Sequence, residues 1–205
     1  MFRFFKSHKL ILFIPLAFWL YNWSFENTAI FWYMYPFAIL VLMSASIVFS
    51  KISDELPTWK SLIFGLGYGT LIYGIIALGY RLLQFFPIHI DNSVSNFLAV
   101  LAPTSIWHYL LLMFIIVPGE EVFWRGFVQQ QLKRYMPTFT AILLSSVLFG
   151  LALGVGGFWP GQFAGLAAGL VLGALYEWKR SMPLIIIAHL VMIVLLFLVQ
   201  PLPMP

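Results

Sequence analysis

Apolar residues occupy the chain in stretches of about 20, and short polar breaks separate the stretches. A helix needs about 20 apolar residues to cross a bilayer, so this pattern predicts membrane-spanning helices. The expected fold is an all-α, polytopic transmembrane helical bundle with about seven spans. We place the spans at residues 10–24, 28–49, 61–86, 98–131, 139–155, 162–178 and 182–200.

The fourth span is unusually long and contains two prolines, Pro103 and Pro118. Proline lacks an amide hydrogen and interrupts a helix, so the alternative is two pieces. These would be a short helix near residues 94–102 and a second helix from about residue 105. We expect a single integral membrane domain, with N-terminal transmembrane helices in residues 1–97 (about three spans) and a core in residues 98–200.

The basic residues favour one orientation of the helices. Nine of the eleven fall in the N-terminal tail or near the loops after spans two, four and six. The opposite loops, 25–27, 87–97 and 156–161, contain no Lys or Arg and include Glu26 and Asp91. Since cytoplasmic loops are enriched in Lys and Arg, we expect the N-terminus in the cytoplasm and the C-terminus outside. The nine residues are Arg3, Lys6, Lys9, Lys51, Lys60, Lys133, Arg134, Lys179 and Arg180.

The N-terminal segment combines basic residues with an apolar run, which is also the pattern of a signal peptide. The run covers residues 10–20 and is followed by the bulky sequence Tyr21-Asn-Trp-Ser-Phe-Glu, without a small-residue cleavage site. We therefore expect this segment to remain as the first span.

Composition narrows the class of protein further. The 205 residues are 62% hydrophobic and only 9% charged, against roughly 25% charged residues in soluble domains. We therefore expect a multi-pass integral membrane protein in contact with the lipid bilayer. A separate expectation, which composition does not establish, is that this membrane is the plasma membrane of a prokaryote. The net charge of +4 comes from scattered residues without a nucleic-acid-binding fold, so no nucleic acid is expected as a partner. The absence of Cys excludes disulfides and cysteine nucleophiles.

Small residues gather in spans five and six. Gly161, Gly165, Gly169 and Gly173 recur every four residues and therefore share one helical face. Such a face lets two helices approach closely, and we interpret it as tight helix packing. The alternative is that the face leaves room for a substrate backbone.

Three ionisable residues, Glu120, Glu121 and Arg125, lie in the middle of an apolar helix. One charged side chain at a helix centre costs about 2.5–3.5 kcal/mol, so three cost on the order of 8 kcal/mol before they pair. Ionisable residues inside a membrane are therefore candidates for a functional site. Glu121 precedes Arg125 by four residues, the favourable order for a helical ion pair. Glu120 then faces a neighbouring helix, and two carboxylates in different environments can take two roles.

His189 lies in span seven, and counting residues along the helices places it near the same depth as Glu120. At about 1.5 Å per residue, His189 lies about 9–12 Å from the basic boundary, and Glu120 and Phe149 lie about 15–16 Å from it. These depths are compatible with one buried site that opens to the cytoplasm. The alternative for a lone membrane histidine is a hydrogen bond between helices.

Three segments follow one another in the order of a known series of motifs. Gly119-Glu-Glu-Val-Phe-Trp-Arg-Gly-Phe contains Glu-Glu-x-x-x-Arg, residues 141–152 contain a Phe that suits Phe-x-x-x-His, and residues 169–189 lead to a His that suits His-x-x-x-Asn. The series resembles the CPBP family, which comprises type II CAAX prenyl endopeptidases and bacteriocin-processing enzymes, also called Abi proteins. The resemblance covers roughly residues 100–197.

The resemblance implies an intramembrane endopeptidase (a hydrolase) that acts on a membrane-embedded or membrane-anchored peptide or protein. In the family, the first Glu is thought to activate water with help from the motif-two His, while the motif-three His and Asn stabilise the oxyanion. It therefore implies that Glu120 is the base, that Glu121 and Arg125 support it, and that His189 helps to hold the oxyanion. Phe149 occupies the motif-two Phe position. No cofactor is implied. We assign no metal because the sequence has no His-Glu-x-x-His or other firm ligand set, which leaves dependence on a divalent metal open.

The sequence departs from the family pattern at two positions. Leu153 replaces the motif-two His and Ile193 replaces the motif-three Asn. Neither side chain can donate or accept a hydrogen bond. Losing an oxyanion donor costs about 10²–10³ in rate, and losing a base partner about 10²–10⁴.

Three interpretations are therefore open. The first is an active CPBP-type endopeptidase that uses Glu-activated water. The second is a catalytically impaired relative that acts as a membrane scaffold or regulator. The third is a transporter or channel that uses Glu120 and Arg125 as an ion relay, although no second half of the chain mirrors the motif.

Overall fold

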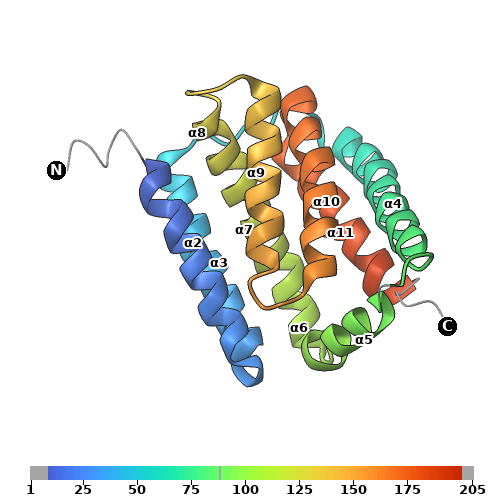
Figure 1. Cartoon of the computed structure of the whole chain (residues 1–205). Helices are drawn as coiled ribbons and strands as arrows, with labels where there is room; N and C mark the ends of the chain where they lie inside the picture. The colour runs from blue at the N-terminus through green and yellow to red at the C-terminus, as the bar shows by residue number, and fades with distance from the viewer. Residues whose placement is uncertain (1–8, 88, 200–205) are drawn as a thin grey trace.

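The computed structural model describes residues 9–87 and 89–199, and over these ranges the chain is an all-α bundle, as predicted (Figure 1). The first helices are α2 (Lys9–Glu26), the 3₁₀ turn η1 (Thr28–Ile30) that continues into α3 (Phe31–Phe49), α4 (Thr58–Leu83) and α5 (Ile90–Leu101). The last helices are α9 (Thr138–Leu153), α10 (Trp159–Lys179) and α11 (Met182–Val194), which ends in the π-helical turn η4 (Leu195–Val199).

Between α5 and α9 one continuous helix, named here the motif helix, covers Ile106–Leu132. Its five segments are α6 (Ile106–Leu111), the π-helical η2 (Leu112–Ile116), α7 (Val117–Glu121), the π-helical η3 (Val122–Gln129) and α8 (Gln130–Leu132). Pro118 has no amide hydrogen to donate, and at the preceding residue the Val117 amide bonds to the Leu112 carbonyl, five residues back. The helix therefore passes the proline by widening rather than by breaking.

The prediction of one helix over residues 98–131 is wrong, and the alternative of two pieces is confirmed. The chain leaves the helical conformation at Ala102, which is extended with ψ 148°, because proline at position 103 disfavours a helical residue before it. The motif helix then begins after Ser105, whose side chain accepts a hydrogen bond from the His108 amide. The predicted loop 87–97 is also wrong over most of its length, because α5 is helical from Ile90.

Within the described residues, four helices are long and apolar enough to cross a membrane, and α9 is a shorter apolar helix. The four candidate spans are Thr28–Phe49, Thr58–Leu83, Ile106–Leu132 and Met182–Val199. The predicted number of seven spans stays a prediction. Many large apolar side chains point outward from the bundle, among them Phe85, Trp107 and Phe139, each at least 70% exposed. An apolar exterior of this kind suits a lipid environment.

The motif helix lies between two groups of packed helices (Figure 1). On one side, α2, α3 and α9 enclose it with buried residues such as Ile39 and Phe149. On the other side, α4, α10 and α11 form a second core around Leu172 and Ile185. Glu120, Glu121 and Arg125 of the motif helix are therefore surrounded by protein rather than by lipid.

The basic residues gather toward one end of the bundle. The loops that follow α3, α8 and α10 lie at the same end, and the basic residues of the described chain gather there, apart from Arg81 and Arg125 (Figure 1). We call this the basic end; it carries Lys9, Lys51, Lys60, Lys133, Arg134, Lys179 and Arg180. Arg3 and Lys6 lie outside the described residues, as does residue 200. The predicted cytoplasmic location of this end stays a prediction.

The glycine face predicted on residues 161–173 packs closely at its centre. A Cβ atom added to Gly169 would lie 2.9 Å from the Cβ of Ser146, so no larger residue fits between α10 and α9 without a shift. This contact confirms the interpretation of tight helix packing at that position.

Candidate active site

Four of the residues singled out from the sequence meet inside the bundle. Glu120 and Glu121 come from α7, Arg125 from η3, and His189 from α11. Their exposed fractions are 5%, 0%, 1% and 4%, so all four are enclosed. Residues 68 positions apart in the chain are thereby in direct contact.

Glu121 is the centre of this cluster. One of its carboxylate oxygens, Oε1, lies 2.9 Å from Arg125 Nη1 and 2.7 Å from His189 Nδ1. The first contact confirms the helical ion pair predicted from the spacing of the two residues. The guanidinium of Arg125 also lies over the ring of Phe149, 4.4 Å from its centroid, so a cation–π contact joins the motif-two Phe to the same cluster.

The contact with Glu121 determines how the imidazole of His189 is used. An ionised carboxylate can only accept a hydrogen bond, so Nδ1 carries the hydrogen and Nε2 is turned toward Glu120. In the neutral ring Nε2 is an acceptor, and in the protonated ring it is a donor. Glu121 and Arg125 thus orient the ring, while Nε2 remains available for chemistry.

Glu120 has different surroundings from its neighbour. Its Oε2 lies 4.0 Å from His189 Nε2, and its Oε1 accepts a hydrogen bond from the hydroxyl of Tyr35 on α3. The contact between α3 and α7 is close because of Gly119, where an added Cβ would lie 2.2 Å from Ile39 Cγ2. Ile39 is one helical turn from Tyr35, so this approach brings the hydroxyl within reach of Glu120.

A cavity of about 190 Å³ adjoins Glu120 and His189. Phe149 also lines it, and so do both positions at which the sequence departs from the family pattern, Leu153 and Ile193. The remaining walls are almost entirely aliphatic and aromatic. The two replaced motif residues therefore line the same cavity as Glu120 and His189, which are retained.

The cavity extends away from the basic end, contrary to the prediction that the site opens on that side. Phe25, Pro103 and Phe158 line it, and all three lie at the opposite end of the bundle. On the basic side the motif helix carries Trp124 and Phe127, both fully buried, which fill the interior. A second apolar cavity of about 470 Å³ shares part of its lining with the first, so the two adjoin.

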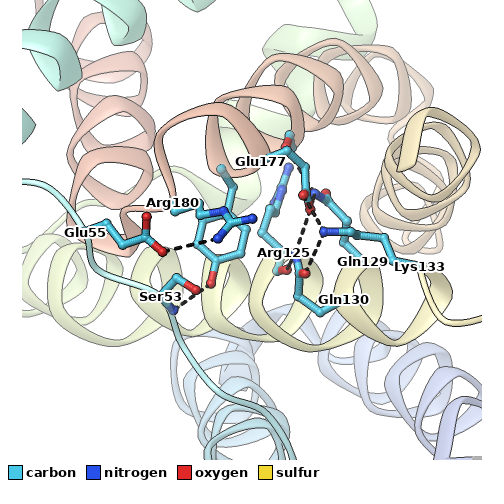
Figure 2. A network of polar contacts seen from close by, with 10 residues as sticks. Ser53, Glu55, Arg125, Gln129, Gln130, Lys133, Glu177 and Arg180 are labelled. Atoms are coloured by element: carbon cyan, nitrogen blue, oxygen red, sulfur yellow. Dashed lines mark hydrogen bonds and ion pairs between the residues drawn. The ribbon is translucent and has the colours of Figure 1, made fainter. Parts of the chain in front are cut away.

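A network of polar contacts lies at the basic end of the motif helix (Figure 2). This network was not predicted from the sequence. Glu177 on α10 accepts hydrogen bonds from Gln129 Nε2 at 2.9 Å and Gln130 Nε2 at 2.7 Å, and it pairs with Lys133. Burial raises the pKa of Glu177, but the hydrogen bonds from Lys133 and the two glutamines outweigh it and hold the pKa below its usual range. The network joins the motif helix to α10.

The neighbouring segment between α3 and α4 is held at the same end. The Ser53 amide donates to the Tyr176 hydroxyl at 3.0 Å, and the Met182 amide donates to the Ser53 carbonyl at 3.0 Å. Glu55 pairs with Arg180 at 3.4 Å, although both side chains are exposed (Figure 2). These contacts fix the turn from which α11, and with it His189, begins.

Tyr35 was also missed, although the sequence contains a signal for it. A tyrosine hydroxyl inside an apolar span needs a hydrogen-bond partner, and Tyr21 and Tyr35 are both buried. The Tyr21 hydroxyl accepts from Trp124 Nε1 at 3.2 Å, next to the Tyr35 contact. Tyrosines in the first two helices were therefore candidates for the site.

The described residues contain no group of three or more His, Asp or Glu side chains arranged to hold a metal ion. The candidate site is instead a carboxylate and an imidazole that face each other, supported by a buried ion pair. Such an arrangement can hold and deprotonate a water molecule and can donate to a developing negative charge.

One known family model matches the part of the chain that contains the candidate site. The family model described as type II CAAX prenyl endopeptidase Rce1-like matches residues 102–195, a segment that contains all three motif regions. The match confirms the resemblance to the CPBP family, whose CAAX members are membrane proteases. Together with the apolar helices, it indicates an integral membrane protein. The searches of the curated proteins and of the solved structures gave no match.

Proposed function

We propose that this chain is a CPBP-type intramembrane endopeptidase that hydrolyses a peptide bond with water activated by Glu120. The observation that carries the proposal is the 4.0 Å separation of Glu120 Oε2 and His189 Nε2 at the wall of an apolar cavity. One water molecule can bridge two polar atoms at this separation with hydrogen bonds of ordinary length. The bridging water is the nucleophile.

The four side chains of the cluster and one water molecule are sufficient for the proposed hydrolysis. Glu120 takes a proton from the water as the water oxygen bonds to the carbonyl carbon, and the carbonyl oxygen becomes an oxyanion. His189, when protonated, donates from Nε2 to that oxyanion. The carbonyl re-forms as the carbon–nitrogen bond breaks, and Glu120 returns its proton to the leaving amine. Glu121 and Arg125 hold the imidazole in place throughout.

The nature of the cavity indicates the class of substrate. Apart from Glu120 and His189 its walls carry no ionisable side chain other than tyrosine, so apolar residues around the scissile bond fit it best. We propose a membrane-embedded or membrane-anchored peptide or protein as the substrate, which reaches the site from the bilayer. We also propose the plasma membrane of a prokaryote as the location, with the basic end in the cytoplasm.

The second candidate function is a catalytically impaired relative that acts as a membrane scaffold or regulator. The observation that favours it is specific: Leu153 and Ile193 line the same cavity as Glu120 and His189, so the apolar replacements remove hydrogen-bonding groups from the site itself. Such a protein would keep the fold and the paired charges and bind other membrane proteins without cleaving them.

One experiment separates the two candidates. The full chain is reconstituted in lipid vesicles with a library of membrane peptides, and products are detected by mass spectrometry. We expect cleavage by the wild type and its loss in Glu120→Gln. Glu26→Gln is the matched control, since Glu26 is exposed at the far end of α2. Cleavage that persists in Glu120→Gln rules out Glu120 as the base. Absence of cleavage in the wild type, together with peptides that co-purify, supports the scaffold.

A further inference from the structure

Tyr35 is a buried tyrosine that the mechanism above does not use. It lies on α3, it is 4% exposed, and its hydroxyl donates to Glu120 Oε1. Its ring is held on two sides, stacked on Phe31 with 5.2 Å between centroids and edge-on to Tyr21 at the same separation. The hydroxyl therefore has a fixed position, and it faces the base of the proposed reaction.

The role of Tyr35 follows from a comparison with Leu153, which lines the same cavity. In the family pattern the motif-two histidine assists the first glutamate, and Leu153 occupies that position here. Tyr35 and Leu153 line the same cavity, which also contains Glu120. The polar contact that an apolar leucine cannot make is thus supplied from a different helix.

We infer that Tyr35 is a positioning residue for Glu120 and replaces the assistance that the histidine would give. This inference rests on the proposed function. The terminal torsion of a glutamate is broad, so an unrestrained carboxylate would rotate both oxygens past the cavity. With Oε1 held by Tyr35, Oε2 is the oxygen that faces His189 and the nucleophilic water. Tyr35 acts through Glu120 and does not touch the reacting atoms.

The test uses the full chain in lipid vesicles and compares three variants: Tyr35→Phe, Leu153→His, and the two combined. Phenylalanine keeps the ring packing against Phe31 and removes only the hydroxyl. Tyr176→Phe is the matched control, because Tyr176 is equally buried and its hydroxyl also has a hydrogen-bonded partner, but it lies at the basic end outside the cavity. For each variant, kcat, KM, the pH profile of kcat and the midpoint of thermal unfolding are measured.

We expect Tyr35→Phe to lower kcat by about 10²-fold, the low end for loss of a base partner, with KM changed by less than about twofold. The pH profile should shift in Tyr35→Phe and stay unchanged in Tyr176→Phe. The combined variant should recover at least about tenfold of the lost rate, since the histidine returns the missing contact. A kcat of Tyr35→Phe within twofold of the wild type would overturn the inference. So would a loss of rate that Leu153→His does not rescue.

A second measurement keeps this inference separate from the proposed function. Infrared difference spectra, with Glu120→Gln subtracted, report the carboxyl band of Glu120 whether or not a peptide is cleaved. Tyr35→Phe should shift that band, and Tyr176→Phe should leave it in place. If the wild type cleaves nothing, the proposed function fails while the band shift still shows that Tyr35 holds Glu120. An unshifted band overturns the positioning role even if cleavage is found.

Discussion

His189 Nδ1 lies 2.7 Å from Glu121 Oε1, and this contact joins the last long helix to the middle of the motif helix. The same oxygen is paired with Arg125, so one carboxylate balances a guanidinium and orients an imidazole. We therefore predict a structural role for Glu121. Glu120, one residue earlier, is left to face the cavity. The two adjacent glutamates have different surroundings, so we predict different roles that substitutions can distinguish.

The first prediction concerns this separation. Glu121→Gln leaves the Arg125 charge buried without its partner, so it should lower the midpoint of thermal unfolding. Glu120→Gln keeps an oxygen that can accept from Tyr35, so it should leave the midpoint nearly unchanged and reduce cleavage by at least about 10²-fold. Thermal unfolding in detergent and peptide cleavage, measured on the same preparations, check both effects. Equal unfolding midpoints in the two variants would contradict the assignment.

The second prediction concerns the other half of the ion pair. Arg125→Ala should destabilise the protein by about 3–5 kcal/mol, because it leaves the buried carboxylate of Glu121 without its guanidinium partner. Arg180→Ala is a suitable comparison, since Arg180 and Glu55 form an ion pair whose side chains are 64% and 59% exposed. That variant should change stability by less than about 1 kcal/mol. Both free energies of unfolding can be obtained by denaturant titration in mixed micelles. Similar values for both variants would mean that the Arg125 pair is solvated.

Much of the helix pattern and the Glu121–Arg125 pair could be predicted because both depend on local spacing. A contact four residues along a helix is set by helical geometry, whatever the neighbouring helices do. The alternative with a short helix near residues 94–102 anticipated α5, but the start of the helix was missed because Asp91, Asn92 and Ser93 resemble a polar loop. Its buried residues, Ile90 and Val94, are nevertheless one helical turn apart, which was the available signal.

The contacts between helices could not be predicted in the same way. The approach of Tyr35 to Glu120 depends on how closely α3 and α7 pack at Gly119, which no single stretch of sequence specifies. The direction of the cavity depends on where the bulky side chains of the motif helix fill the interior. Trp124 fills the side nearer the basic end, and residue counting along isolated helices contains no information about that.

The third prediction concerns the polar network at the basic end (Figure 2). Hydrogen bonds hold the pKa of Glu177 below its ordinary value of 4.5, so the folded state binds the proton less readily than the unfolded chain. The resulting stabilisation is present above about pH 4.5 and is lost as the pH falls through the lowered pKa of the folded state. The Glu177→Gln variant should therefore lose less stability than the wild type as the pH falls below about 4.5. Unfolding midpoints of both proteins across this range check the effect, and parallel curves would show that Glu177 does not contribute.

The fourth prediction concerns the two apolar replacements, which should differ in their effect. If Tyr35 already holds Glu120, Leu153→His alone should change the rate of cleavage by less than about tenfold, below the usual contribution of a base partner. Ile193→Asn places a hydrogen-bond donor beside His189 in the cavity, and an oxyanion donor is worth about 10²–10³ in rate. We therefore expect Ile193→Asn to raise kcat substantially, with little change in KM.

Leu151→Asn is the control for that gain, because Leu151 is 47% exposed on α9 and does not line the cavity. A rate increase shared by both asparagine variants would point to a general effect on folding or insertion. An increase in Leu153→His alone would mean instead that the motif-two position, and not the oxyanion position, limits the reaction. That result would also argue against Tyr35 as the partner of Glu120, since a base already held in place gains little from a second partner.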